Sequence, residues 1–228
     1  MKAVRKKAFT ALIAGASGLV GGSLVGQLRD SGDYSRIHLL VRRPLGVQSD
    51  LIREHLVDFE RLQEACGSIG RVDHAFCCLG TTIRKAGSQA AFRRVDHDYV
   101  LAFGRLAASL GARGLVVVSA LGADAGSGNF YLRVKGETER DLRRLDLTAL
   151  VIVRPSLLTG DRSEFRLAER LGGVLLGAVS PLMVGPMKRV RPVSALRVAE
   201  TMQRAAGEER AGVRIIESEQ IHRGDSQG

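Results

Sequence analysis

The stretch Phe9-Thr10-Ala11-Leu12-Ile13-Ala14-Gly15-Ala16-Ser17-Gly18-Leu19-Val20-Gly21 decides the fold. It begins with a short apolar run that is typical of a buried strand. Val20, Leu24 and Leu28 then recur every four residues, as on one face of a helix. Between these two patterns the glycines have the spacing G-x-x-G-x-x-G. A strand, a glycine turn and a helix in this order predict the dinucleotide-binding start of a βαβ unit.

Each glycine of this turn has an expected role. Gly15 would allow the tight turn, Gly18 the close approach of a pyrophosphate, and Gly21 the close packing of helix on strand. The free N–H groups and the dipole at the helix start favour an anion. Glycines at such a junction could also serve packing alone, and this alternative stays open. The predicted cofactor contacts of the turn are Gly15, Ser17, Gly18, Leu19, Val20 and Gly21.

Outward from this turn, short apolar runs alternate with helical patterns along the chain. A stripe at steps of three and four from Phe92 to Leu110 predicts one long amphipathic helix with a buried face. The alternation predicts an α/β protein with a three-layer Rossmann fold, in which a doubly wound, mostly parallel sheet is covered on both faces. We expect one domain over residues 1–228, with a small substrate-binding segment at about 159–191. The expected strands are Phe9–Ala14, Ile37–Val41, Leu56–Phe59, His74–Leu79, Gly114–Ser119, Leu147–Val153 and Val213–Glu217.

The end of the second expected strand indicates which dinucleotide is bound. An NAD(H) site places an acidic residue there for the ribose 2′-OH, but this strand ends in Arg42 and Arg43. Asp33 belongs to the turn before the strand and cannot be that acceptor. Two guanidinium groups suit a 2′-phosphate, which favours NADP(H) over NAD(H), although both could be solvated surface residues. Asp58, which we expect to end the third strand beside Phe59, could accept from the adenine or cap a helix.

A second candidate site follows the fifth expected strand. Tyr131 and Lys135 are one helical turn apart and share a face. A tyrosine that exchanges a proton near neutral pH needs its pKa lowered from about 10, and one ammonium about 4 Å away supplies enough energy in principle. Ser119 could donate to the substrate oxygen and hold it against Tyr131. A Y-x-x-x-K pair alone is weak, but its place in this pattern favours catalysis.

Taken together, these motifs resemble the short-chain dehydrogenase/reductase superfamily, with the glycine spacing of its extended and atypical branches. Four further segments resemble the Tat-interacting-protein oxidoreductases and their bacterial relatives. These segments are Cys77-Cys78-Leu79-Gly80-Thr81-Thr82, Lys85-Ala86-Gly87, Val95-Asp96-His97-Asp98-Tyr99-Val100 and Tyr131-Leu132-Arg133-Val134-Lys135-Gly136-Glu137.

The resemblance implies an NADP(H)-dependent oxidoreductase that acts on a small carbonyl or alcohol, with Ser119, Tyr131 and Lys135 as the catalytic triad. Asp96 stands where many superfamily members have an asparagine of a proton relay, which leaves an NADPH-binding sensor with little turnover as the alternative. Nucleotide-sugar epimerase or dehydratase chemistry would need a larger C-terminal lobe. The further cofactor contacts that the resemblance implies are Leu79, Gly80, Thr81, Pro155, Ser156, Leu157 and Leu158.

Composition limits the other function classes. The net charge is +10, but four basic residues lie within the first seven, and aromatic residues make up only 4% of the chain, so we expect no nucleic-acid binding. No apolar run is long enough for a membrane span. The cysteines Cys66, Cys77 and Cys78 have no C-x-x-C spacing, which predicts reduced thiols and a cytoplasmic location. The dispersed histidines predict no metal site.

The substrate and the assembly are less defined. The apolar stretch Leu171–Val179 could line a pocket for an apolar small molecule or form an interface, although core packing is the commoner role. We expect a monomer or a homodimer. We predict that Ser194 caps the last long helix.

Overall fold

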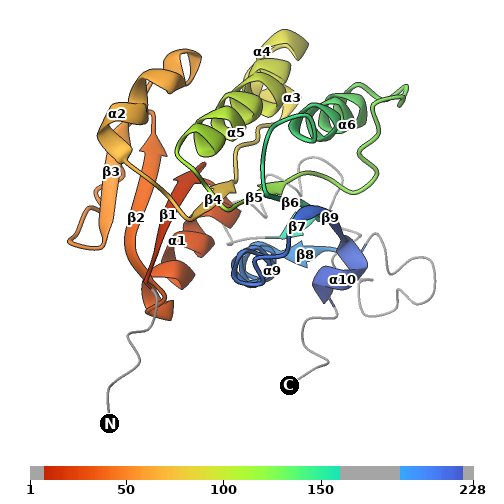
Figure 1. Cartoon of the computed structure of the whole chain (residues 1–228). Helices are drawn as coiled ribbons and strands as arrows, with labels where there is room; N and C mark the ends of the chain where they lie inside the picture. Colours follow the sequence, from red (N-terminus) through yellow and green to blue (C-terminus); the bar gives the residue numbers. More distant parts are fainter. Residues whose placement is uncertain (1–7, 160–190, 223–228) are drawn as a thin grey trace.

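A computed structural model describes residues 8–159 and 191–222, and Figure 1 shows their arrangement. Seven parallel strands form one sheet in the order β3-β2-β1-β4-β5-β6-β9. The chain starts in the middle of the sheet and moves outward in both directions, so the strand order reverses between β1 and β4. The strands are β1 (Phe9–Ala14), β2 (Tyr34–Val41), β3 (Ile52–Leu56), β4 (His74–Cys77), β5 (Gly114–Val118), β6 (Ala149–Arg154) and β9 (Gly212–Glu217).

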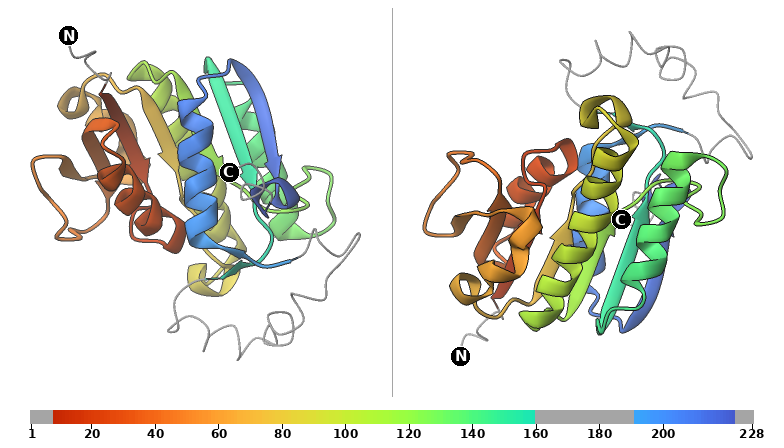
Figure 2. Two further views of the ribbon diagram at one scale, coloured as in Figure 1. Left: turned by 90° about the horizontal axis from the view of Figure 1, so that it is seen from below. Right: turned by 90° about the horizontal axis from the view of Figure 1, so that it is seen from above.

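Helices cover both faces of this sheet, which makes three layers. Helices α1 and α9 lie side by side on one face, and α5 and α6 lie on the other (Figure 2). The first layer buries Leu24 and Met202 against the sheet, and the second buries Phe103 and Leu142. The long helices are α1 (Leu19–Ser31), α5 (Tyr99–Ser109), α6 (Phe130–Leu142) and α9 (Ala195–Gly207). The predicted three-layer Rossmann fold is therefore confirmed.

Short elements connect these layers. The shorter helices are η1 (Phe59–Ala65), α2 (Cys66–Ile69), α3 (Ile83–Ala86), α4 (Gln89–Arg93), the π-helical turn η2 (Arg94–Asp98) and α10 (Ser218–His222). A separate two-stranded sheet pairs β7 (Leu158–Thr159) with β8 (Val193–Ser194). Ser194 caps α9 as predicted, because its hydroxyl accepts from the backbone N–H of Arg197 at 3.3 Å.

Two local predictions were wrong. The third strand is Ile52–Leu56 and not Leu56–Phe59. It lies at the edge of the sheet, where a charged and exposed residue such as Arg53 is tolerated, so the strand does not form a continuous apolar run in the sequence. Phe59 instead begins η1. The stripe from Phe92 to Leu110 is buried at Phe92, Phe103, Leu106 and Leu110 but only half-buried at Val95 and Tyr99, and the π-helical turn η2 interrupts the expected single helix between α4 and α5.

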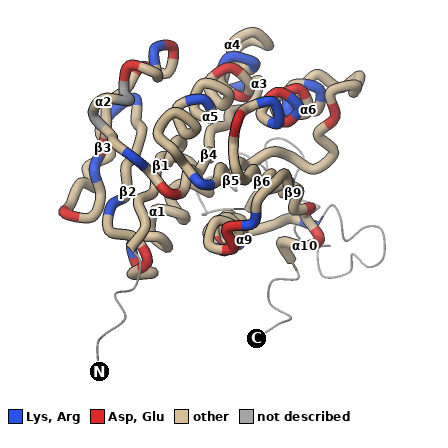
Figure 3. Tube along the Cα trace, viewed as in Figure 1, with Lys and Arg blue, Asp and Glu red and all other residues tan. Residues whose placement is uncertain are grey.

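Acidic and basic residues are interspersed over the surface elements. Figure 3 shows both kinds along α6 and α9. Within the ranges that the structure covers, no helix combines the length and apolar character needed to cross a bilayer. Among the described residues, Cys77 and Cys78 form no disulfide, and burial raises the pKa of Cys77 to about 12. The candidate substrate segment lies outside the described residues except at its two ends.

Candidate functional site

The glycine turn lies between β1 and α1, at the point where the strand order reverses. Gly15 has a φ of +88°, and a Cβ there would lie 2.4 Å from the backbone oxygen of Cys78. A Cβ on Gly21 would lie 2.1 Å from the oxygen of Gly15. The packing of the chain itself therefore requires both glycines.

Gly18 is different, because a Cβ there would have only one close neighbour, the oxygen of Gly15 at 3.4 Å. It is the N-cap of α1, no side chain caps the first N–H groups of the helix, and Gly18, Leu19 and Val20 line the cleft described below. Packing within the chain does not explain a glycine here. A bare backbone beside free N–H groups fits the close approach of a phosphate.

A cavity of about 780 Å³ opens beside this turn, at the carboxyl ends of β1 and β2. Arg42 and Arg43 line it, as expected, together with Lys85 from α3 and Arg94 from η2. Lys85 stands in one of the segments that carry the resemblance but was given no cofactor role, and Arg94 was not singled out, since both reach the cavity only through the fold. The predicted contacts that line this cavity are Gly15, Ser17, Gly18, Arg42, Arg43, Phe59, Leu79, Gly80 and Thr81.

Asp58 lies just after β3 and not within a strand. Its carboxylate accepts from the backbone N–H of Glu60 at 2.9 Å, so it caps η1. It is not among the described residues that line the cavity. The capping alternative is thus observed, and a contact with adenine stays a prediction.

A second cavity of about 770 Å³ continues from the first across the carboxyl ends of β4, β5 and β6. Both cavities share Gly18 and the segment after β4, so they form one cleft. The ring of Tyr131 packs against the ring of Phe92, with their centroids 5.6 Å apart. The structure brings together here Gly18, Leu19, Val20, Leu79, Gly80, Thr81, Asp96, Ser119, Tyr131, Lys135, Pro155, Ser156, Leu157 and Leu158.

Lys135 does not act on the cleft as a lone ammonium. Its Nζ lies 2.7 Å from Oδ1 of Asp96, and both side chains are buried. The other oxygen of Asp96 accepts from the backbone N–H of Thr81 at 2.8 Å. Burial lowers the pKa of Lys135 and the carboxylate of Asp96 raises it, with a net rise. The positive field at Tyr131 is therefore weaker than the sequence argument assumed, because a carboxylate opposes it.

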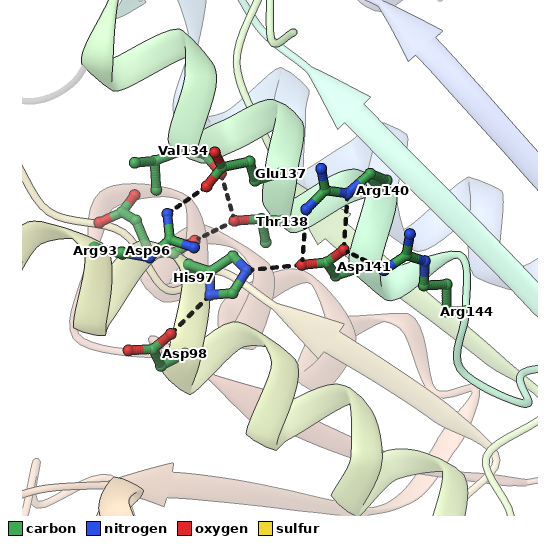
Figure 4. Close-up of polar contacts among 10 residues, drawn as sticks. All are labelled: Arg93, Asp96, His97, Asp98, Val134, Glu137, Thr138, Arg140, Asp141 and Arg144. Atoms are coloured by element: carbon green, nitrogen blue, oxygen red, sulfur yellow. Dashed lines mark hydrogen bonds and ion pairs between the residues drawn. The ribbon is translucent and has the colours of Figure 1, made fainter. Parts of the chain in front are cut away.

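The π-helical turn that carries Asp96 is tied to α6, the helix that carries Tyr131 and Lys135 (Figure 4). The hydroxyl of Thr138 lies 2.7 Å from the backbone oxygen of Val134 and 3.0 Å from that of Asp96, so its one hydrogen is shared between the two helices. On the outer side, His97 lies between Asp98, at 2.7 Å, and Asp141, at 3.1 Å. Extra residues in π turns are frequent at functional sites, and this one aims a carboxylate at the buried lysine.

Ser119 follows β5 directly and lines the second cavity. Its hydroxyl donates to the carboxylate of Glu139 at 2.6 Å. The guanidinium of Arg154 binds the same carboxylate through Nε at 2.9 Å and Nη2 at 2.6 Å, and it also binds Glu217 at 2.9 Å. The hydrogen bond with Glu139 raises the pKa of Arg154. Sequence reasoning missed Glu139, although its place one turn after Lys135 on α6 was visible.

The fold, the glycine turn and the cleft are those of a Rossmann-fold protein of the short-chain dehydrogenase/reductase class. The chain is 38% identical over 170 residues to the protein HTATIP2 of Rattus norvegicus. The alignment covers 73% of this chain and 70% of that protein. It therefore belongs to the HTATIP2 family, in the atypical branch of that superfamily, as the motifs indicated. It is also 30% identical over 218 residues to the mitochondrial protein FMP52 of Eremothecium gossypii, in an alignment that covers 92% of this chain and 95% of that protein. No protein-family model matches the chain.

Solved structures show the same fold. MoeE5 in complex with UDP-glucose and NAD aligns with a TM-score of 0.67 at 18% identity, over 91% of this chain and 75% of that one. The UDP-glucose 4-epimerase of Thermotoga maritima aligns with a TM-score of 0.67 at 15% identity, over 91% and 76%. The predicted cytoplasmic location is contradicted, because several FMP52 relatives are named mitochondrial.

Proposed function

We propose that this protein is an NADP(H)-dependent oxidoreductase that transfers hydride to or from a small carbonyl or alcohol. One observation carries the proposal: Ser119, Tyr131 and Lys135 line the same cavity as Gly18 of the glycine turn. A dinucleotide whose phosphates lie at Gly18 would extend into the cavity that Tyr131 faces. When bound, the nicotinamide supplies or accepts the hydride.

The preference for NADP(H) is supported by the charges around the first cavity. Arg42, Arg43, Lys85 and Arg94 line it, and none of its described lining residues is acidic. A 2′-phosphate carries negative charge that arginine forks bind in pairs of charge-assisted hydrogen bonds. A ribose 2′-OH would instead require an acidic acceptor.

In this proposal Tyr131 exchanges the proton with the reacting oxygen. Lys135 keeps positive charge beneath the site, and Asp96 holds Lys135 and the backbone of Thr81 in place. Ser119 lies beside the reacting oxygen and orients the substrate. Pro155 to Leu158 form the apolar side of the cavity.

Turnover of NADPH with a panel of small aldehydes and ketones tests the proposal. We expect Tyr131→Phe to lower kcat/KM by about 100-fold or more, because it removes the acid and keeps the ring. Tyr34→Phe is the matched control, since Tyr34 lines neither cavity and its hydroxyl pairs with Nδ1 of His74 at 2.9 Å. Equal rates for the wild type and Tyr131→Phe would remove Tyr131 from its assigned role.

A second candidate, a cofactor-binding sensor with little turnover, is favoured by two contacts. Lys135 forms an ion pair with Asp96, and Ser119 donates a hydrogen bond to Glu139, so both groups already have partners within the protein. This alternative predicts stabilisation by NADPH without turnover on any member of the panel.

A further inference from the structure

A row of three contacts joins the π-helical turn η2 to α6. On α6 the row consists of Lys135, Thr138 and Asp141, which follow one another at steps of three residues and so lie along one face of the helix. They contact, in the same order, the carboxylate of Asp96, the backbone oxygen of Asp96 and the ring of His97. The first contact faces the cleft, and the third lies outside the described lining of both cavities.

The ring of His97 has a carboxylate at each nitrogen (Figure 4). Nδ1 lies 2.7 Å from Oδ1 of Asp98, and Nε2 lies 3.1 Å from Oδ2 of Asp141. The hydrogen bond from Arg140 lowers the pKa of Asp141, burial opposes this effect, and the hydrogen bond from His97 adds to it, so that the pKa is about 2. A carboxylate only accepts, and a neutral imidazole has one N–H for two acceptors. Both contacts together therefore require a doubly protonated, cationic ring.

Of the two carboxylates, Asp141 is the one that joins the turn to α6. Asp98 belongs to the same turn as His97, and its side chain is 56% exposed. The side chains of His97 and Asp141 are 9% and 20% exposed, so their ion pair is better shielded from water. The charged groups that surround the ring are Asp98 of η2, Glu137, Arg140, Asp141 and Arg144 of α6, and Arg93 of α4, which pairs with Glu137.

We propose that His97 is a positioning residue for the cleft, because its cationic ring, bound to Asp141, holds η2 on α6 and thereby holds the carboxylate of Asp96 between Lys135 and Thr81. Asp96 and His97 are adjacent in the chain, so a shift of one moves the other. The proton on a ring outside the cleft is then linked to the lysine beside Tyr131. The effect on turnover rests on the proposed function, whereas the effect on Asp96 does not.

The link has a direction with pH. When the ring of His97 loses a proton, one N–H serves two carboxylates. The contact with Asp141 then loses either its hydrogen or its positive charge, and charge-assisted hydrogen bonds are roughly twice as strong as neutral ones. The turn is therefore held more firmly on α6 at low pH than at high pH.

Amide hydrogen exchange at Thr81 tests the link without any turnover, because this N–H donates to Asp96 at 2.8 Å. We expect His97→Gln to speed the exchange about fivefold, since a neutral amide replaces the charged donor. His97→Arg keeps a cation toward Asp141 at every pH and should retain the protection. The amide of Ile13, which is fully buried in β1, reports global unfolding and separates a local change from lost stability.

Asp141→Asn tests the other half of the ion pair. We expect the same loss of protection at Thr81 as with His97→Gln, and no further loss in the double variant, because both changes remove one contact. His222→Gln is the matched control on α10, where the ring lies 3.1 Å from the backbone oxygen of Arg191, and it should keep the wild-type exchange. Unchanged exchange in both His97→Gln and Asp141→Asn would overturn the inference.

Nitrogen NMR of the ring tests the protonation directly. We expect hydrogen on both ring nitrogens of His97 at about pH 6. A single N–H at this pH overturns the inference whatever the turnover.

The pH dependence of kcat with NADPH tests the effect on the proposed reaction. From about pH 6 to about pH 9 we expect kcat of the wild type to fall about fivefold relative to His97→Arg, with the KM for NADPH unchanged. A constant ratio over this range would limit His97 to a structural role and overturn its link to the reaction. If the wild type reduces no carbonyl, the proposed function fails, while exchange at Thr81 still decides whether His97 positions Asp96.

Discussion

Asp96 decides how much positive charge reaches the proposed proton-transfer site. Asp96→Asn keeps an oxygen for the N–H of Thr81 but removes the charge that opposes Lys135. We expect the free energy of unfolding to fall by about 3–5 kcal/mol, because the single oxygen of the amide stays with Thr81 and its NH2 group, itself a donor, then faces the buried ammonium of Lys135. We also expect the pH–rate profile to move toward lower pH, because the ammonium is unopposed.

Urea unfolding and the pH dependence of kcat measure the two effects. Asp98→Asn is the matched control on the same turn, since the side chain of Asp98 is 56% exposed and does not reach Lys135. A profile that stays in place while stability falls would show that Asp96 acts only on folding.

A second residue-level prediction concerns the pair of His38 on β2 and His55 on β3. Their ring nitrogens lie 2.7 Å apart, and burial, followed by the charge of His55, lowers the pKa of His38 to about 4. The unfolded chain takes up this proton near pH 6.5, so it binds more protons than the folded protein below that pH. Stability is therefore full above about pH 6.5 and is lost as the pH falls toward 4.

We expect this loss to be about 1–3 kcal/mol over that window. Urea unfolding at pH 7 and pH 4.5 measures it, and His38→Gln, which cannot take up the proton, should lose less stability between the two values. The same pH dependence in both proteins would contradict the role of His38.

At the scale of the element, α6 depends on a glycine that lets a loop approach it. A Cβ on Gly136 would lie 2.1 Å from the backbone nitrogen of Ala125 and 2.2 Å from the carbonyl carbon of Asp124. Gly136→Ala gains up to about 1 kcal/mol of helix propensity, but backbone atoms cannot move aside as a side chain can. We expect a net destabilisation of about 1–3 kcal/mol by urea unfolding.

Gly128→Ala is the control for this change. Nothing lies within 4 Å of a Cβ at Gly128, which belongs to the same loop region. We expect its stability to stay within about 0.5 kcal/mol of the wild type. Equal effects of the two substitutions would mean that the close approach of loop and helix is not rigid.

The elements also show what the sequence could predict. β1, α1 and the helix with Tyr131 and Lys135 follow from local patterns, since a buried strand, a glycine turn and an i, i+4 pair are visible within a few residues. The strand Ile52–Leu56 escaped, because its polar alternation suits an edge strand. The π turn at Asp96 escaped because tertiary contacts to α6 stabilise it, and the pairing of Glu139 with Arg154 joins residues from two layers.

At the scale of the whole molecule, the proposed cofactor would contact both cavities of the cleft, which extends from the end of β2 to the end of β6. Its binding should therefore stabilise the folded protein. A ligand at 100 times its Kd stabilises the folded state by about 2.7 kcal/mol. For a chain of this size that raises Tm by roughly 5–10 °C. We expect a shift of this order with NADPH and a smaller one with NADH at equal concentration, in a thermal-shift titration.

The difference between the two cofactors depends on the charges around the first cavity. Arg42→Ala/Arg43→Ala should reduce the NADPH shift to the level of NADH, because the 2′-phosphate loses two guanidinium partners. Arg61→Ala/Arg144→Ala is the matched control, since it removes the same charge from exposed ion pairs with Glu64 and Asp141 outside the cavity. High salt should narrow the gap between NADPH and NADH in the wild type, because these arginines are exposed to solvent. A larger shift with NADH than with NADPH would replace NADP(H) by NAD(H) as the proposed cofactor.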